Sequence, residues 1–420
     1  MADLPETFEE FDRKISDLFQ KKQLEKIISE CSARIVTAKK GGQVPLEILA
    51  FSHLSRGLAY YDALDPESTQ NALNDLHEAN NLDIAQVLKR FHPLCYLAAH
   101  AKTARALHHI KLIFAVFCRL QDKLVDAPSK SKKIAHYTEL RVLKNLARSE
   151  PFRLYNVGYM NDPEEGKVFF KVINQVIRKL DPQKQIDIQK LFYSSESKNS
   201  YSPAYVGSFV RVEKEENEQK SRNLFLWRTY GKNQGEEGAG ACLHFNAGGF
   251  SGQSPLMFGH MSLHGTAASE QCIYRVVYEN EVESDEELKN YLLCLAEVLI
   301  QAEEIDWKDE KDGFYKVVRE LLDQIRFLFK SDYYSAEGEL RIVQSHYTDK
   351  SGRLIARGAV HTDMDSSPPR FFVEVTKSLP LETVILGPVA RRFWGWEQWL
   401  KQQNSDLEVR KSDIPYGERD

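Results

Sequence analysis

The sequence predicts an α+β protein, in which an all-helical module precedes an α+β domain with a mixed or antiparallel sheet. Apolar residues recur at helical spacing over residues 1–150 of the 420-residue chain. From Pro151 onward, short strand-like runs alternate with helical segments and glycine-containing loops. A hydrophobic share of 42% and a charged share of 28% are typical of a globular chain.

The charge and the apolar pattern exclude several classes of protein. The net charge is -5, from 56 basic and 61 acidic residues, so no basic field favours nucleic acid as a partner. No run of 18 apolar residues occurs, and we therefore expect no membrane span. The six cysteines form no CxxC pair, which predicts reduced thiols and no metal site. An acidic N-terminus without an apolar segment favours a cytoplasmic protein; secretion into a host cell without a classical signal peptide stays open.

Residues 1–126 are the predicted helical module. Its first helices are indicated by apolar residues at helical spacing, namely Phe8, Phe11, Ile15, Leu18 and Phe19, and then Leu24, Ile27, Ile28, Cys31 and Ile35. A Gly-Gly pair at 41–42 and an Asp-Pro pair at 65–66 mark the predicted turns.

Residues 47–84 carry a more specific pattern of small and large side chains. Gly57 lies three positions before Tyr60, and after a short turn Ala72, Leu76 and Ala79 follow. This pattern resembles the tetratricopeptide repeat, a helical hairpin whose small residues let two helices pack closely. The resemblance implies a repeat-like module that recruits a protein target on its concave face. A plain helical bundle would show the same periodicity and remains the alternative.

Residues 127–150 are predicted to be a linker and a short helix, and residues 151–420 the α+β domain. A basic, proline-containing stretch at 127–133 indicates the linker, and the helix runs to about Arg148. In the domain, strands are expected near 152–154, 205–212, 239–245, 271–278, 339–347, 370–375, 381–387 and 407–410, and helices at 285–304, 314–330 and 389–403.

Four polar segments of this domain are candidates for a functional site. The first segment holds Arg153, Asn161 and Asp162. The second holds Ser208, which lies on a predicted strand. An aspartate before Pro163 is also typical of a helix N-terminus, and a strand serine can be purely structural. Both interpretations remain open.

The third segment holds Trp227, Arg228 and Tyr230. An aromatic pair beside an arginine can stack on a planar ring and contact phosphates. The same aromatic residues could instead pack in the protein core.

The fourth segment holds Tyr334, Glu337, Glu339 and Arg341. The two glutamates are two positions apart, just before and on a predicted strand, so their side chains are expected to point the same way. Like-charge proximity raises the pKa of one carboxyl group, and a nearby cation holds the other ionised. A solvated strand end is the alternative interpretation.

Together these segments resemble a bacterial family of domains of unknown function. The set MNDPEEG, LWRTYG before ACLHF, GELRI, ILGP and SDIPYG spans roughly residues 151–417. That family is marked by an NDPxE start, a WxxY motif, a late ExExR motif and a closing I-x-G segment. Because such domains occur with helical repeats in bacteria, including intracellular pathogens, the resemblance implies a bacterial protein and an effector or toxin role.

The order of Arg153, Ser208, Glu337 and Glu339 is also similar to the pattern of mono-ADP-ribosyltransferases. The resemblance implies that Arg153 binds the phosphates of NAD, Ser208 orients the nicotinamide ribose, and Glu339 stabilises the oxocarbenium ion. Cleavage of a nicotinamide glycosidic bond does develop positive charge on the ribose, which a fixed carboxylate stabilises.

The predicted function is therefore an enzyme that transfers ADP-ribose from NAD to a protein recruited by the helical repeats. Trp227, Tyr230 and Tyr334 are candidates for an aromatic wall against the nicotinamide ring, and Asn161, Asp162, Arg228 and Arg341 are expected to be further cofactor-binding residues. A non-catalytic adaptor or nucleotide-sensing binding module remains the alternative.

Overall fold

The fold was analysed in a computed structural model of the whole chain. The structure describes residues 8–62, 71–78, 104–126, 133–180, 187–193, 204–212, 224–250, 272–305, 311–375 and 379–414, apart from positions 22, 73, 76–77, 161, 163, 249, 304, 306–310, 346, 349–353, 356–359, 365 and 367.

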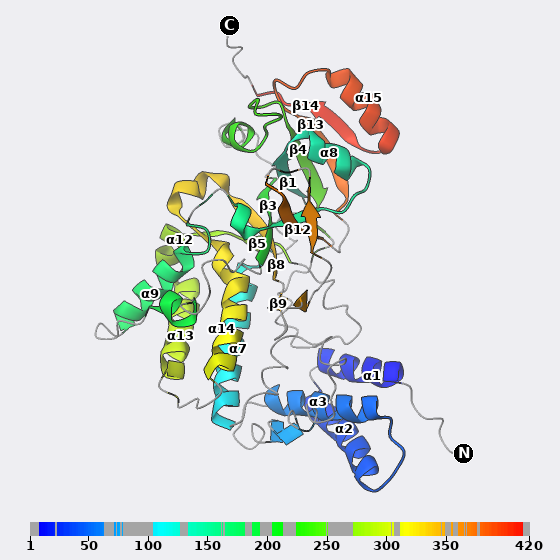
Figure 1. Cartoon of the computed structure of the whole chain (residues 1–420), viewed down its shortest axis with the longest axis vertical. Helices are drawn as coiled ribbons and strands as arrows, with labels where there is room; N and C mark the ends of the chain where they lie inside the picture. The colour runs from blue at the N-terminus through cyan, green and yellow to red at the C-terminus, as the bar shows by residue number, and fades with distance from the viewer. Residues whose placement is uncertain are drawn as a thin grey trace.

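Three helices, α1 (Phe8–Gln20), α2 (Leu24–Lys39) and α3 (Leu46–Asp62), pack together at the N-terminal end (Figure 1). Phe11, Ile27 and Phe51 are buried between them, as the apolar spacing predicts. Asp75, on the helical residues that follow α3, accepts hydrogen bonds from His53 and Arg56 at 2.7–2.9 Å. Leu76 and Ala79 lie outside the described residues, so the repeat assignment stays a prediction.

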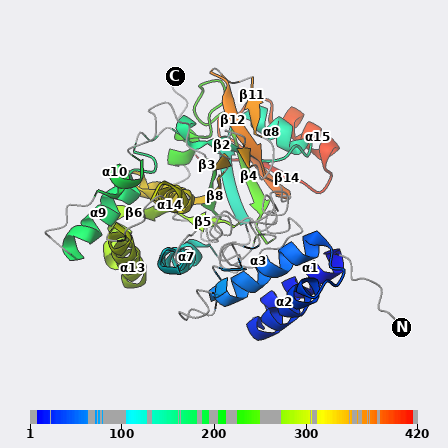
Figure 2. The same ribbon diagram turned by 60° about the horizontal axis from the view of Figure 1, so that its bottom comes forward.

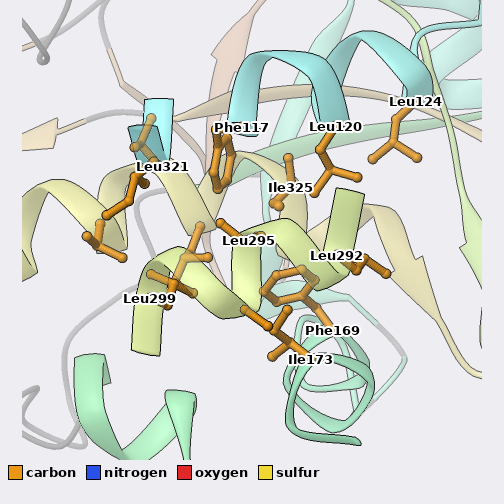
Figure 3. Packing of buried hydrophobic residues seen from close by; sticks show 14 of the residues in the cluster. Phe117, Leu120, Leu124, Phe169, Ile173, Leu292, Leu295, Leu299, Leu321 and Ile325 are labelled. Atoms are coloured by element: carbon orange, nitrogen blue, oxygen red, sulfur yellow. The ribbon is translucent and has the colours of Figure 1, made fainter. Parts of the chain in front are cut away.

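A second group of helices forms one side of the molecule. Helix α7 (Ala104–Leu124) packs against α13 (Glu286–Glu303) and α14 (Lys311–Ile325), and α9 (Val168–Leu180) packs against α13. Figure 3 shows Phe117 and Leu120 of α7 in one cluster with Leu295 and Ile325. The predicted boundary at residue 126 is therefore crossed by a continuous hydrophobic core.

The sheet is ten-stranded and mixed. Its order is β11-β12-β2-β3-β1-β4-β13-β14, and β8 pairs with both β3 and β5. The strands are β1 (Lys133–Thr138), β2 (Arg153–Asn156), β3 (Ala204–Arg211), β4 (Ala241–Asn246), β5 (Tyr274–Arg275), β8 (Glu339–Ser345), β11 (His361–Asp363), β12 (Arg370–Glu374), β13 (Leu381–Leu386) and β14 (Glu408–Lys411). All pairs are antiparallel except β13 with β14.

The remaining elements are short. Helices α8 (Leu140–Ala147) and α15 (Phe393–Gln403) lie on the opposite side of the sheet from α7, α9, α13 and α14 (Figures 1 and 2). The others are α10 (Ile188–Tyr193), α12 (Glu279–Ser284), and the strand pairs β6 (Val277–Tyr278) with β7 (Phe329–Lys330) and β9 (Tyr347–Thr348) with β10 (Leu354–Ile355). Among the described helices, none is both long enough and apolar enough to cross a membrane.

Strand β3 is the point at which the sheet divides. One edge of β3 pairs with β8 from Ala204 to Val210. The other edge pairs with β2 through Tyr205 and Val206 and with β1 through Val210 and Arg211, which leaves the middle of that edge between two diverging strands. There the ring nitrogen Nδ1 of His136 donates a hydrogen bond to the carbonyl oxygen of Ser208 at 2.8 Å.

The prediction for residues 133–138 is wrong. They were assigned to the linker and short helix, but they form β1, an interior strand of the sheet between β3 and β4. The run KIAHYT shows no strict alternation of apolar and polar residues, and both of its partner strands lie far along the chain. Tertiary pairing thus overrides a weak local preference. The short helix that follows is confirmed as α8.

Three further parts of the chain differ from the prediction. The expected strand at 271–278 is divided into β5 and β6, because β5 pairs with β8 whereas β6 pairs with β7. The expected helix at 314–330 ends at Ile325 and continues as a 3-10 turn and strand β7. Helix α9 lies in a region to which no helix was assigned.

We predict that Leu120→Ala destabilises the protein by about 3 kcal/mol, because it opens a cavity among α7, α13 and α14. Leu120 is 0% exposed, whereas its neighbour Arg119 on the same helix is exposed. Urea unfolding of Leu120→Ala and of the control Arg119→Ala measures the two costs. Equal and small costs would show that α7 is not part of this core.

Candidate functional site

A cavity of about 320 Å³ lies where the sheet divides at β3. It is lined by residues of β1, β2 and β3, by helix α8, and by the 3-10 segment Asp332–Glu337. Most of the predicted site residues line it: Arg153, Asp162, Ser208, Tyr230, Tyr334, Glu337 and Glu339. The early arginine and the late acid pair thus line one cavity.

Glu339 is the first residue of β8 and is 5% exposed. In the β3–β8 register, Ser208 lies opposite Arg341, so the side chains of Ser208, Glu339 and Arg341 share one face of the sheet. Arg341 donates to both carboxylate oxygens of Glu339, from Nε at 2.7 Å and from Nη2 at 2.9 Å. Burial alone would raise the pKa of Glu339, but Arg341, Lys330 and the Ser208 hydroxyl lower it to about 2.

Glu337 is held by a different set of donors. Lys330 Nζ lies 2.6 Å from Glu337 Oε2 and 3.0 Å from Glu339 Oε2, so one ammonium group bridges the two carboxylates. The hydroxyl of Tyr230 donates to Glu337 Oε1 at 2.7 Å. Between the two glutamates, Gly338 adopts a left-handed conformation with φ of 55°, which favours glycine. This turn places Glu337 beside the same ammonium group as Glu339.

The two cations of this cluster are buried. Lys330 is 4% exposed, and its Nζ lies 4.5 Å from the centroid of the Tyr334 ring. Burial lowers the pKa of Lys330, but the charges of Glu339 and Glu337 outweigh this effect and raise it overall. Both cations therefore stay charged, because the neighbouring carboxylates likewise raise the pKa of Arg341 well above its usual value.

Arg341 is anchored on its far side by the turn that precedes α9. It pairs with the carboxylate of Glu165 and donates to the carbonyl oxygen of Phe327. Gly166, with φ of 74°, brings this turn so close to Phe327 that an added Cβ would lie 2.6 Å from its ring. A glycine is thus required for Glu165 to reach Arg341.

Arginines from three elements also line the cavity: Arg141 on α8, Arg153 on β2 and Arg370 on β12. In the strand order, β2 and β12 lie on the other side of β3 from β8, which begins at Glu339. Arg153 lies 3.2 Å from Glu150 and 4.5 Å above the ring of Phe372. Phe372 pairs with Tyr155, and Arg370 pairs with Asp363, so their side chains share one face of the β2–β12–β11 edge. Arg141 Nη2 lies 3.7 Å from Asp363.

Three predicted site residues do not line the cavity. Trp227 is 2% exposed and packs in a core cluster with Ala135 and Cys242, and its ring lies edge-on to Tyr137 at 5.0 Å. The alternative of aromatic core packing therefore applies to Trp227, which is not a wall for a ligand ring. Arg228 is exposed outside the cavity.

Arg341 is the third exception, because it is 0% exposed and all its described contacts are with the protein. It binds the carboxylates instead of a cofactor, since its position on β8 directs it beneath the acid pair. The position of Asn161 lies outside the described residues.

Asp162 lines the cavity and is 7% exposed. Its Oδ1 accepts a hydrogen bond from the backbone N–H of Glu164 at 2.9 Å, which forms an Asx turn before α9 instead of the helix cap that Pro163 suggested. Its Oδ2 is buried and has no hydrogen-bond partner among the residues that the structure describes.

Sequence reasoning missed Lys330, His136 and Arg370 as residues of the site. The signal for Lys330 was a single lysine directly after the apolar run Phe327–Phe329, where a buried charge requires a partner. His136 carried no such signal, since it lies on the strand that was not predicted. Burial lowers the pKa of His136, so the ring is neutral and Nδ1 carries the proton that it donates to Ser208.

The described residues contain no group of three or more histidine, cysteine, aspartate or glutamate side chains that could hold a metal ion.

We predict that Glu339→Gln lowers the free energy of unfolding by about 3 kcal/mol at neutral pH, because it removes the carboxylate that the two buried cations Arg341 and Lys330 share. The pKa of Glu339 is about 2 in the folded protein, below its usual 4.5. Its contribution is therefore complete above about pH 4.5 and is lost as the pH falls toward 2.

Urea unfolding at pH 7 and at pH 3 measures this difference, which should be smaller at pH 3. The matched control is Glu283→Gln, whose side chain is 62% exposed in a surface ion pair with Lys179. An equal, small cost for both variants would mean that the buried pair contributes nothing to stability.

No protein-family model, curated protein or solved structure matches this chain.

Proposed function

We propose that this chain is an ADP-ribosyltransferase-like enzyme that uses NAD as a substrate and modifies a protein target recruited by its N-terminal helices. The observation that carries the proposal is the convergence of Arg153, Ser208, Glu337 and Glu339 on one cavity, although they lie far apart in the sequence. That order of residue types is the one that resembles mono-ADP-ribosyltransferases.

The charges of the cavity are divided in a way that suits NAD. Arg141, Arg153 and Arg370 can bind the diphosphate, since guanidinium groups form paired hydrogen bonds with phosphate oxygens. The acid pair lies away from them and can face the ribose that becomes positively charged. Of the predicted aromatic residues, Tyr230 and Tyr334 remain candidates for a wall against the nicotinamide ring.

In the proposed reaction, the bond between the nicotinamide nitrogen and the ribose carbon breaks, and its electron pair leaves with neutral nicotinamide. The ribose becomes an oxocarbenium ion, which a carboxylate of the site stabilises. A nucleophilic side chain of the target then forms the new bond to this carbon and releases its proton to solvent. Without a target, water takes that place, and the other products are ADP-ribose and a proton.

The helices α1–α3 are assigned to target recruitment in this proposal. Their support is the tetratricopeptide-like pattern of Gly57, Tyr60 and Ala72 and the close packing of α2 against α3. A bacterial origin, an effector or toxin role, and a cytoplasmic location or delivery into a host cell complete the proposal.

A non-catalytic adaptor or nucleotide-sensing module is the second candidate. One observation favours it: Glu339, the carboxylate that the resemblance assigns to the oxocarbenium ion, is fully engaged by Arg341, Lys330 and Ser208. A carboxylate in this state has little capacity to respond to a new positive charge.

We predict that the protein binds NAD and releases nicotinamide, and that Arg153→Met weakens NAD binding about tenfold or more, because a charge-assisted contact to phosphate is lost. Calorimetric titration with NAD measures the affinity, and an assay of free nicotinamide measures turnover. The matched control is Arg391→Met, whose side chain is 84% exposed and outside the cavity. Binding without nicotinamide release would favour the second candidate, and no binding would contradict the proposal.

A further inference from the structure

The two carboxylates of the acid pair, Glu337 and Glu339, differ in the number of hydrogen bonds that they already accept. A carboxylate can accept about four hydrogen bonds. Glu339 accepts them from Arg341 Nε, Arg341 Nη2, Lys330 Nζ and the Ser208 hydroxyl. In the described part of the chain, Glu337 accepts them from Lys330 Nζ and the Tyr230 hydroxyl. Glu337 therefore keeps acceptor capacity, whereas Glu339 has none left.

The number of neighbouring cations also differs between the two glutamates. Glu165 and Glu339 flank the guanidinium of Arg341 on two sides, and Lys330 approaches Glu339 as well. Three carboxylates, Glu165, Glu337 and Glu339, face two cations, Lys330 and Arg341, so the cluster carries one excess negative charge. Glu339 has two cations within 3.0 Å, whereas Glu337 has only Lys330, so Glu337 is the less compensated member of the acid pair.

We infer that Glu337, and not Glu339, is the carboxylate that touches the reacting ribose, and that Glu339 and Lys330 are positioning residues. This inference rests on the proposed function and reverses the roles that the resemblance implies for the two glutamates. Glu339 fixes Arg341 and Lys330, and Lys330 together with Tyr230 orients the carboxylate of Glu337.

The reaction step assigned to Glu337 is the cleavage described above. As the bond between the ribose carbon and nitrogen breaks, the electron pair goes to the nicotinamide nitrogen, and the positive charge on the ribose is met by the carboxylate of Glu337. Tyr230 keeps its proton throughout, since burial and the charge of Glu337 raise the pKa of its hydroxyl. Its hydrogen bond therefore orients Glu337 without neutralising it.

The test compares isosteric amides at the two positions, with Glu286→Gln as a control whose side chain is 73% exposed on α13. We expect Glu337→Gln to lower the turnover number for nicotinamide release about 100-fold with little change in NAD affinity, because charge stabilisation is lost only in the transition state. Its thermal melting should stay close to that of the wild type, since Lys330 keeps Glu339 as a partner.

Glu339→Gln should instead lower the melting temperature and, at a temperature where it is folded, reduce the turnover number less than Glu337→Gln does. The inference is overturned if Glu339→Gln abolishes nicotinamide release while Glu337→Gln retains it. Circular dichroism shows whether Glu337→Gln loses turnover because it unfolds. If it does unfold, Glu337→Asp replaces it in the comparison, since it keeps the negative charge but moves it away from its native position.

A binding measurement separates this inference from the proposed function. Calorimetric titration with the N-methylnicotinamide cation reports whether a free carboxylate faces the cavity, with or without turnover. We expect Glu337→Gln to weaken its binding at least tenfold and Glu339→Gln to weaken it less. If the wild type released no nicotinamide from NAD, the proposed function would fail, and the role of Glu337 would be decided by this titration alone. The role of Glu337 is overturned if the wild type and Glu337→Gln bind the N-methylnicotinamide cation equally, or if neither binds it.

Discussion

The ammonium group of Lys330, shared by two buried carboxylates, is the interaction on which the rest of the site depends. It joins β7 to the turn before β8, and through Glu339 and Arg341 it extends to β3 and to the turn before α9. Charges this deeply buried are tolerated only where opposite charges face them, because an unpaired charge is costly in a medium of low dielectric. The cluster therefore fixes several chain segments together with the geometry of the acids.

The division of the sheet at β3 provides the space beside this cluster. A strand with one continuous neighbour and two partial ones exposes backbone polar groups where the partial neighbours diverge, and these groups require partners. His136 supplies one of them at the carbonyl oxygen of Ser208. The same divergence opens the cavity between acids on one side and arginines on the other. A single topological feature thus creates both the space and the polar lining.

The success of sequence reasoning varied with the range of the interactions involved. Strands β2, β3, β8, β12 and β13 and helices α13 and α15 were found from local periodicity, which burial on one face dictates. Strand β1 was missed because its partners are distant in sequence. Within the site, the acid pair and Ser208 were recognised as residue types in order. Trp227 was misassigned, since an aromatic residue near an arginine can serve a core as well as a ligand.

The sequence by itself determined the helical and strand-rich halves, the candidate acids and the early arginine, because these depend on side-chain type and short-range spacing. Only the tertiary structure decided that α7 joins the core of the later helices, that Arg341 lies beneath the acids, and that Lys330 bridges them. The reason is physical: which donor satisfies which buried charge depends on distances between segments far apart in the chain, and no local pattern encodes those distances.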